Sequence, residues 1–239
     1  MIMKNNGNFI AFNEQSYNVL FSTGDNDVSY NMADSSLQKK FNDLCSELKI
    51  EDIFYLKQIH SDKILVCDEK HKYHGECEGD ALITKLRRNA VGIFTADCVP
   101  VLIADNKNNV IAAVHSGWRS TIANIVGKTI IKMKESFGCS SENLKVFIGP
   151  HNKQCCYEVS EELISKFKNV DYLKNTDINN GRFLSLENCI IKQCKINGVR
   201  RENIITTQYC TFCSENVQFH SYRKSGKKSG RQFSLIYIK

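Results

Sequence analysis

Apolar residues along the chain follow two patterns, short continuous runs and longer stretches with helical spacing. In residues 118–137 they recur every three or four positions, and Gly138 provides a natural end. The helices that this spacing predicts span 35–48, 118–137, 161–167 and 185–196. The short runs, bounded by turn-forming residues, indicate β-strands. They span 17–22, 53–59, 64–66, 81–84, 90–94, 99–104, 110–114, 146–148, 203–207, 218–222 and 233–238.

The order of these elements favours an α+β fold. Predicted strands and helices interleave, but hairpins outnumber crossovers, so we expect mixed β-sheets with flanking helices in a single domain over residues 1–239. Residues 110–148 form a strand–helix–strand unit, which predicts a right-handed crossover to a neighbouring parallel strand. The polar segment 68–79 is expected to be a loop.

Two of the apolar runs, 99–104 and 110–114, are predicted to form a hairpin. The Asp-Asn-Lys-Asn-Asn segment between them is rich in turn formers. Folding it about its midpoint pairs residues whose numbers sum to about 214, which sets Cys98 beside Ser116 and diagonal to His115. A thiol and an imidazole would then lie at the open end of one hairpin, close enough to share a ligand.

A second histidine follows another predicted strand, because His60 comes directly after residues 53–59. If this strand end meets the hairpin, His60, Cys98 and His115 form a His-Cys-His cluster, the usual donor set of a catalytic zinc site with an open fourth position. That position binds and activates water or polarises a substrate. The alternative is two surface histidines and one buried cysteine, and spacing alone leaves both interpretations open.

The start of the predicted helix at 118–137 adds a possible anion site. Its N-terminus would point back to the open end of the hairpin, and free N–H groups there favour a phosphate or lower a thiol pKa. The positive charge of Arg119 in the first turn is unfavourable for the helix dipole, but its guanidinium is placed to make a bidentate contact with a phosphate. We therefore expect Ser116, Gly117 and Arg119 to contact phosphate, the alternative being a solvated arginine at the surface.

Composition narrows the class of protein. The chain of 239 residues is 42% hydrophobic and 24% charged, as in ordinary globular proteins, and no apolar run approaches the ~18 residues of a membrane helix. Residues 1–8 lack the apolar core of a signal peptide, so the eleven cysteines are expected to be reduced thiols in the cytoplasm. The net charge of +6 is modest and does not by itself indicate a surface that binds nucleic acid. We expect no nucleic-acid or membrane partner, and we favour a monomer.

Four further segments support only weaker interpretations. The histidines and cysteine in 71–77 have ligand spacing, but their segment is polar, and we assign no metal to them. Residues 210–213 form a lone C-x-x-C without a second pair, and the adjacent cysteines at 155–156 are expected to be packing or incidental. The basic loop 223–231 is either a solvated turn or a segment that closes over substrate.

Several motifs carry a resemblance to a known family. They are Gln58-Ile59-His60, Gly79-Asp80-Ala81-Leu82-Ile83-Thr84, Thr95-Ala96-Asp97-Cys98-Val99-Pro100-Val101-Leu102, Ala113-Val114-His115-Ser116-Gly117-Trp118-Arg119, Gly149-Pro150, Cys156-Tyr157-Glu158-Val159 and Phe219-His220-Ser221-Tyr222-Arg223. Over about residues 17–238 the chain resembles the YfiH-like, laccase-domain family. The resemblance implies a fold like that of cytotoxic necrotizing factor and zinc ligands at His60, Cys98 and His115. The chain departs from the family at 24–27, 39–40 and 151–154, away from these ligands.

The resemblance also implies an activity, because the family is described as purine nucleoside phosphorylases that deaminate adenosine as well. We expect zinc-dependent glycosyl transfer from adenosine, inosine and 5′-methylthioadenosine to phosphate, with zinc as cofactor and copper as the alternative metal. The expected partners are purine nucleosides and phosphate. In this interpretation the catalytic residues are His60, Asp97, Cys98, His115 and Arg119. Asp80 and Asp97 orient the ligands or handle a proton.

Three other functions stay open at this point. Cys98 could act as a nucleophile with His115 as its base, as in cysteine amide hydrolases. Relatives have also been called peptidoglycan-editing factors, which implies a role in quality control of wall precursors. A copper polyphenol oxidase is disfavoured, because the six histidines are few and scattered for a multicopper centre.

Overall fold

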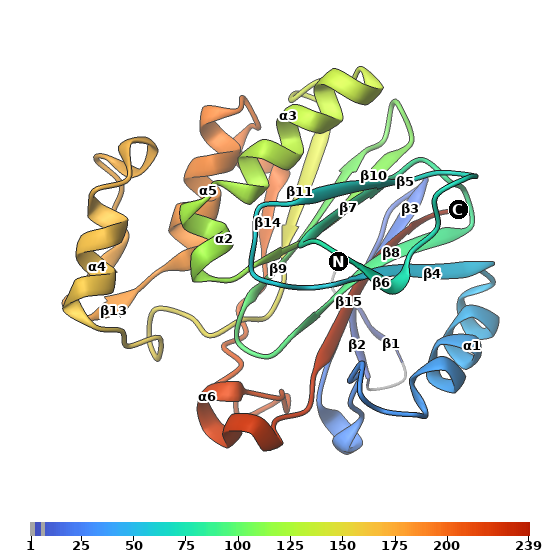
Figure 1. Ribbon diagram of the computed structural model, residues 1–239, viewed down its shortest axis with the longest axis horizontal. Helices are drawn as coiled ribbons and strands as arrows, with labels where there is room; N and C mark the ends of the chain where they lie inside the picture. Colours follow the sequence, from blue (N-terminus) through green and yellow to red (C-terminus); the bar gives the residue numbers. More distant parts are fainter. Residues whose placement is uncertain (1–2, 6–7) are drawn as a thin grey trace.

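The computed structural model describes residues 3–5 and 8–239, and two β-sheets form its centre (Figure 1). In spatial order, the seven-stranded sheet contains β1 (Met3–Asn5), β2 (Phe9–Asn13), β3 (Tyr17–Ser22), β15 (Gln232–Ile238), β8 (Asn89–Thr95), β4 (Asp52–Lys57) and β6 (His74–Glu78). The six-stranded sheet contains β14 (Ile204–Thr206), β11 (Leu144–Ile148), β9 (Val99–Asp105), β10 (Val110–Ser116), β7 (Ala81–Thr84) and β5 (Ile64–Cys67). A small ribbon joins β12 (Asn179–Asn180) to β13 (Phe183–Leu184).

The two sheets pack face to face through one apolar core. Along β9, Leu102 and Ala104 point into this inter-sheet core, whereas Val101 and Ile103 point to the opposite face, which helices cover. Successive side chains of a strand alternate between faces, so a strand buried on both faces is apolar throughout. This explains the unbroken apolar runs of the predicted hairpin.

Helices cover the outer face of each sheet (Figure 1). The helices are α1 (Leu37–Leu48), α2 (Trp118–Ile122), α3 (Ile125–Phe137), α4 (Glu161–Lys168), α5 (Leu186–Ile196) and α6 (Tyr222–Ser225). Helices α2 to α5 share an apolar core with the six-stranded sheet. On the other side, α1 packs against the seven-stranded sheet through Phe41, whose ring centroid lies 4.7 Å from that of Phe233. The predicted α+β fold of mixed sheets with flanking helices is therefore confirmed.

The single helix predicted at 118–137 is wrong, because the chain forms two helices there. Asn124 lies between α2 and α3 with a φ of 63°, in the left-handed region that interrupts a right-handed helix. Asparagine is one of the few residues that adopt this conformation readily, so the apolar spacing continues while the backbone does not. As a result α2 contains only five residues.

Two other segment predictions also need correction. Residues 218–222 form no strand: the backbone N–H of Gln218 donates to the Asp25 carboxylate, and the ring of His220 bonds to the carbonyl of Val28. Residues 68–79, expected to be a loop, contain β6, which pairs in parallel with β4. The crossover from β10 leads to the parallel strand β11, which is not its neighbour as predicted, because β9 lies between the two strands.

Among the described helices, none has the length and apolar character needed to cross a membrane. The expectation about a signal peptide concerns residues 1–8, of which 1–2 and 6–7 lie outside the described residues.

Candidate metal centre

Three side chains from separate parts of the chain meet at the ends of the central strands. His60 follows β4, Cys98 lies between β8 and β9, and His115 is near the end of β10. Their ligand atoms all lie within 4.8 Å of one another, and Cys98 Sγ is 3.9 Å from His60 Nε2. The two imidazole rings are 4.8 Å apart at an angle of 82°. Two imidazoles and one thiol thus converge on one point.

The hairpin brings Cys98 to this point with a register that differs by one residue from the expected one. Ser116 pairs with Val99, not with Cys98, and His115 pairs with Pro100. Cys98 therefore lies just outside the ladder, after Asp97, whose φ is 82°. The left-handed backbone at Asp97 forms part of the turn that joins β8 to β9.

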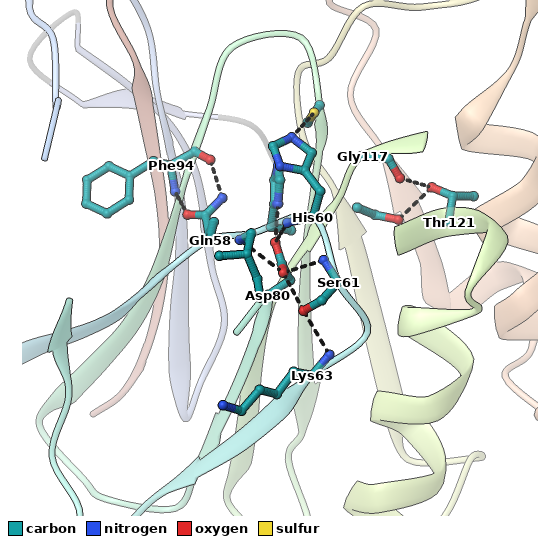
Figure 2. A network of polar contacts seen from close by, with 12 residues as sticks. Gln58, His60, Ser61, Lys63, Asp80, Phe94, Gly117 and Thr121 are labelled. Carbon is teal, nitrogen blue, oxygen red and sulfur yellow. Dashed lines mark hydrogen bonds and ion pairs between the residues drawn. The ribbon is translucent and has the colours of Figure 1, made fainter. Parts of the chain in front are cut away.

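The buried carboxylate of Asp80 holds the backbone of the His60 loop (Figure 2) and the imidazole ring of His115. It accepts hydrogen bonds from the backbone N–H groups of Ile59, His60 and Ser61 and from His115 Nδ1, the last at 2.8 Å. Burial opposes its ionisation, but the hydrogen bonds from His115 and Ser61 prevail and lower the pKa of Asp80. Because Nδ1 of His115 donates to the carboxylate, its Nε2 is left to act as a ligand.

A side-chain amide holds the strand that leads to His60. The amide of Gln58 donates to the carbonyl of Phe94 and accepts from the N–H of Phe94, each at 2.7 Å (Figure 2). This pair continues the contact between β4 and β8 beyond the last backbone pairing. The loop that carries His60 is consequently fixed to the strand that leads to Cys98.

Electrostatics favour a thiolate at Cys98. Burial opposes the charged form, but the neighbouring imidazoles of His115 and His60 outweigh burial and lower the pKa of Cys98 to about 6. Burial also disfavours a charged His115, yet the Cys98 thiolate and Asp80 raise the pKa of His115 to about 9. A thiolate is the form of cysteine that binds a metal or attacks a substrate.

Glycine at position 117 allows the chain to pass close to this cluster. A Cβ atom on Gly117 would lie 2.9 Å from His60 Cδ2 and 3.1 Å from Cys98 Sγ. The hydroxyl of the buried Ser116 pairs with that of Thr121 at 2.8 Å. Neither residue offers the open anion site that the sequence suggested, because both are packed against the protein and the helix that follows is short.

Arg119 lies apart from the cluster. Its guanidinium carbon stacks over the ring of Trp118, 4.2 Å from the centroid, and its side chain is exposed. The structure therefore does not bring Arg119 together with His60, Cys98 and His115.

A cavity of about 640 Å³ opens beside the three ligands. Phe94, Tyr157 and Tyr222 supply aromatic surface to its wall, and Arg223 and Arg231 supply positive charge. The Arg223 guanidinium donates to the carbonyl of Glu158, and that of Arg231 donates to the carbonyls of residues 229 and 230. From the sequence, these two arginines are predicted only to belong to a basic loop. The signal that could have identified Arg223 is that it ends the motif Phe219-His220-Ser221-Tyr222-Arg223.

Asp97 lines the same cavity, but its carboxylate is occupied. It accepts from the Thr211 hydroxyl at 2.6 Å, from the Ser221 hydroxyl at 3.0 Å and from the backbone N–H of Arg223 at 2.7 Å. Asp97 thus anchors the C-terminal wall of the cavity to the β8–β9 turn.

Comparison with known proteins identifies the family. The family model described as multi-copper polyphenol oxidoreductase laccase matches residues 4–239. The chain belongs to this family. A purine nucleoside phosphorylase of Clostridium acetobutylicum is 44% identical over 231 residues, 97% of this chain and 96% of the relative. An adenosine deaminase, RL5, from an unknown prokaryotic organism is 30% identical over 202 residues, 80% of this chain and 76% of the relative.

A solved structure confirms the family fold. The crystal structure of a Bacillus licheniformis hypothetical protein YfiH superimposes with a TM-score of 0.89, over 100% of this chain and 99% of the other, at 21% identity. The expected resemblance to the YfiH-like family is therefore confirmed. The named relatives associate this family with the processing of nucleosides.

Proposed function

We propose that this protein is a zinc-dependent purine nucleoside phosphorylase with adenosine deamination as a side activity. The observation that carries the proposal is the His60–Cys98–His115 cluster, which borders a cavity that also holds aromatic rings and two arginines. A volume of about 640 Å³ is within the usual range of small-molecule sites. Relatives named purine nucleoside phosphorylase and adenosine deaminase support the assignment.

The donor set fits zinc. Two imidazole nitrogens and one thiolate with an open side are typical of catalytic zinc sites, and the contact from Asp80 to His115 is the outer carboxylate that such sites use. Zinc bound here would supply a Lewis acid that polarises the substrate or lowers the pKa of a bound water. Copper is the alternative metal.

The remaining groups of the cavity are suited to a nucleoside and phosphate. The rings of Phe94, Tyr157 and Tyr222 offer apolar surface for a purine base. Arg223 and Arg231 donate hydrogen bonds to carbonyl oxygens. Because these acceptors are neutral, they do not cancel the positive charge of the guanidinium groups, which stays available to a phosphate. We assign phosphate binding to these arginines in place of Arg119.

Replacement of Cys98 by alanine tests the proposal. We expect Cys98→Ala to lose the zinc held by the cluster and to reduce phosphate-dependent release of base from adenosine and inosine by on the order of 100-fold or more. Cys45→Ser, which removes a half-buried thiol on α1, is the matched control and should behave as wild type. Normal phosphorolysis by Cys98→Ala would overturn the mechanism.

A second candidate keeps the same residues without a metal. The Cys98 thiolate beside the His115 imidazolium is also the arrangement of a cysteine nucleophile and its base, as in amide hydrolases. Zinc analysis of protein purified without added metal separates the two candidates. One zinc ion per chain that is present in wild type and lost in Cys98→Ala argues against a free nucleophilic thiol.

A further inference from the structure

Four cysteines form a second cluster, separate from the first. Cys155 and Cys156 come from the segment between β11 and α4, and Cys210 and Cys213 from the segment after β14. Their four sulfur atoms all lie within 4.8 Å of one another, and Cys155 Sγ is 3.7 Å from Cys213 Sγ. Four sulfurs about 2.3 Å from one zinc ion in a tetrahedron would be about 3.8 Å apart. The observed separation matches that geometry and exceeds the ~2.05 Å of a disulfide.

We infer that Cys155, Cys156, Cys210 and Cys213 bind a structural zinc ion. Four thiolates so close together repel one another unless a cation lies between them. A closed set of four sulfur ligands leaves no position for water or substrate, which is the composition of structural rather than catalytic zinc sites.

A backbone amide already supports one of the sulfurs. Cys210 is buried, and its Sγ accepts the backbone N–H of Lys153 at 3.4 Å. An amide-to-sulfur hydrogen bond stabilises a thiolate, and this one ties the 210–213 segment to the segment that carries Cys155 and Cys156.

The zinc ion would join a segment that lines the cavity to the 210–213 segment, which contacts the cavity residue Asp97. Tyr157 and Asn152 line the cavity beside Cys155 and Cys156. The hydroxyl of Thr211, within the second pair, donates to Asp97, and its backbone N–H donates to the carbonyl of His151 at 2.9 Å. The four-cysteine site is thus placed to keep the 151–157 and 210–213 segments in contact, at a distance from the chemistry itself.

Metal content tests the inference, independently of the proposed activity. Protein purified under reducing conditions without added metal should contain two zinc ions per chain. The double variant Cys155→Ser/Cys213→Ser should contain one, Cys98→Ala should contain the other one, and the combined triple variant should contain none. Cys45→Ser should keep both. Zinc content in the double variant equal to that of wild type, or one iron per chain in place of zinc, would overturn the inference.

Thiol reactivity of the wild-type protein provides a test that no folding defect can obscure. Cys155 and Cys213 are exposed, so they should react rapidly with a maleimide if no metal is bound. We expect both to be protected in the purified protein and to become reactive after treatment with a strong chelator, by peptide mapping. The half-buried Cys45 should react equally in both conditions. Rapid labelling of Cys155 and Cys213 before chelation, or a disulfide between any two of the four, would also overturn the inference.

Discussion

At the scale of single residues, Asp80 connects the loop of His60 to the ring of His115, and we predict that its charge matters for metal affinity. Asp80→Asn keeps the shape but supplies a donor where the N–H groups of Ile59 and Ser61 need acceptors. We expect zinc affinity at the first cluster to fall about 10–100-fold. Competition with a chelating dye at constant pH measures the change.

The control for this prediction is Asp62→Asn. Asp62 is exposed and pairs with Lys128 on the surface, so its change should leave zinc affinity as in wild type. Equal zinc affinity in Asp80→Asn and wild type would contradict the orienting role of Asp80.

We predict that Gly117→Ala distorts the same cluster sterically. The added methyl group would lie 2.9 Å from His60 Cδ2, too close for either atom to stay in place. We expect zinc affinity to fall about tenfold or more, because metal ligands need positions within about 0.5 Å. Ser120→Ala, in the same short helix α2, is the control, and a zinc-replete Gly117→Ala enzyme with wild-type turnover would rule the prediction out.

The assignment of phosphate to Arg223 gives a third prediction at this scale. Arg223→Gln should raise the KM for phosphate about 10–100-fold, because a charge-assisted hydrogen bond contributes about 1.5–3 kcal/mol, while zinc content stays unchanged. Arg119→Gln should change the KM for phosphate by less than about twofold, since Arg119 stacks on Trp118 away from the cavity. The opposite result, a large effect only at Arg119, would restore the helix-terminus site.

At the scale of elements, the break between α2 and α3 depends on the left-handed backbone of Asn124. Asn124→Gly should keep the free energy of unfolding within about 0.5 kcal/mol, whereas Asn124→Ala should lower it by about 1–2 kcal/mol, because alanine adopts this conformation at a cost. Urea denaturation followed by circular dichroism measures both. A stabilising Asn124→Ala would mean that a continuous helix is preferred after all.

The elements that can be predicted well from the sequence are those whose own residues are apolar enough to show that the element is buried. Strands β9 and β10 are apolar on both faces, so their existence and pairing were evident, although the register was wrong by one residue. The strand β6 (HGECE) is mostly polar, and only its neighbour β4 shows that it is a strand. Residues 218–222 alternate like a strand, but their hydrogen-bond partners are the Asp25 and Val28 segment, which no local pattern reveals.

The same distinction holds for the two cysteine sites. Cys98 and His115 belong to one hairpin, so local geometry brought them together, and His60 was added by resemblance. The four-cysteine cluster depends on contact between segments more than fifty residues apart, such as Cys155 and Cys213. Spacing rules could not pair them, because an adjacent cysteine pair is no recognised half of a metal motif.

At the scale of the whole molecule, the packing between the two sheets should dominate stability. Phe147 on β11 is 1% exposed and contacts Phe12 and Tyr17 of the other sheet, with ring centroids 5.3 and 6.1 Å away. We predict that Phe147→Ala lowers the free energy of unfolding by about 3–5 kcal/mol, because it leaves a cavity between the sheets. Urea titration measures the loss.

The control uses the same substitution at an exposed position. Phe183 on β13 is 39% exposed, so Phe183→Ala should cost less than about 1 kcal/mol. Similar losses for the two variants would show that the inter-sheet core is not what holds the molecule together.

The position of β15 has a consequence for how the protein is made on the ribosome. This strand is the last of the described strands, yet it pairs with both β3 and β8 in the interior of the seven-stranded sheet. Until residues 232–238 leave the exit tunnel, β3 and β8 present unpaired apolar edges, which are templates for aggregation. Thr211 and Ser221, which donate hydrogen bonds to Asp97, also emerge long after Asp97 itself. A nascent chain therefore completes its seven-stranded sheet and its ligand-binding wall only after residues 232–238 have emerged.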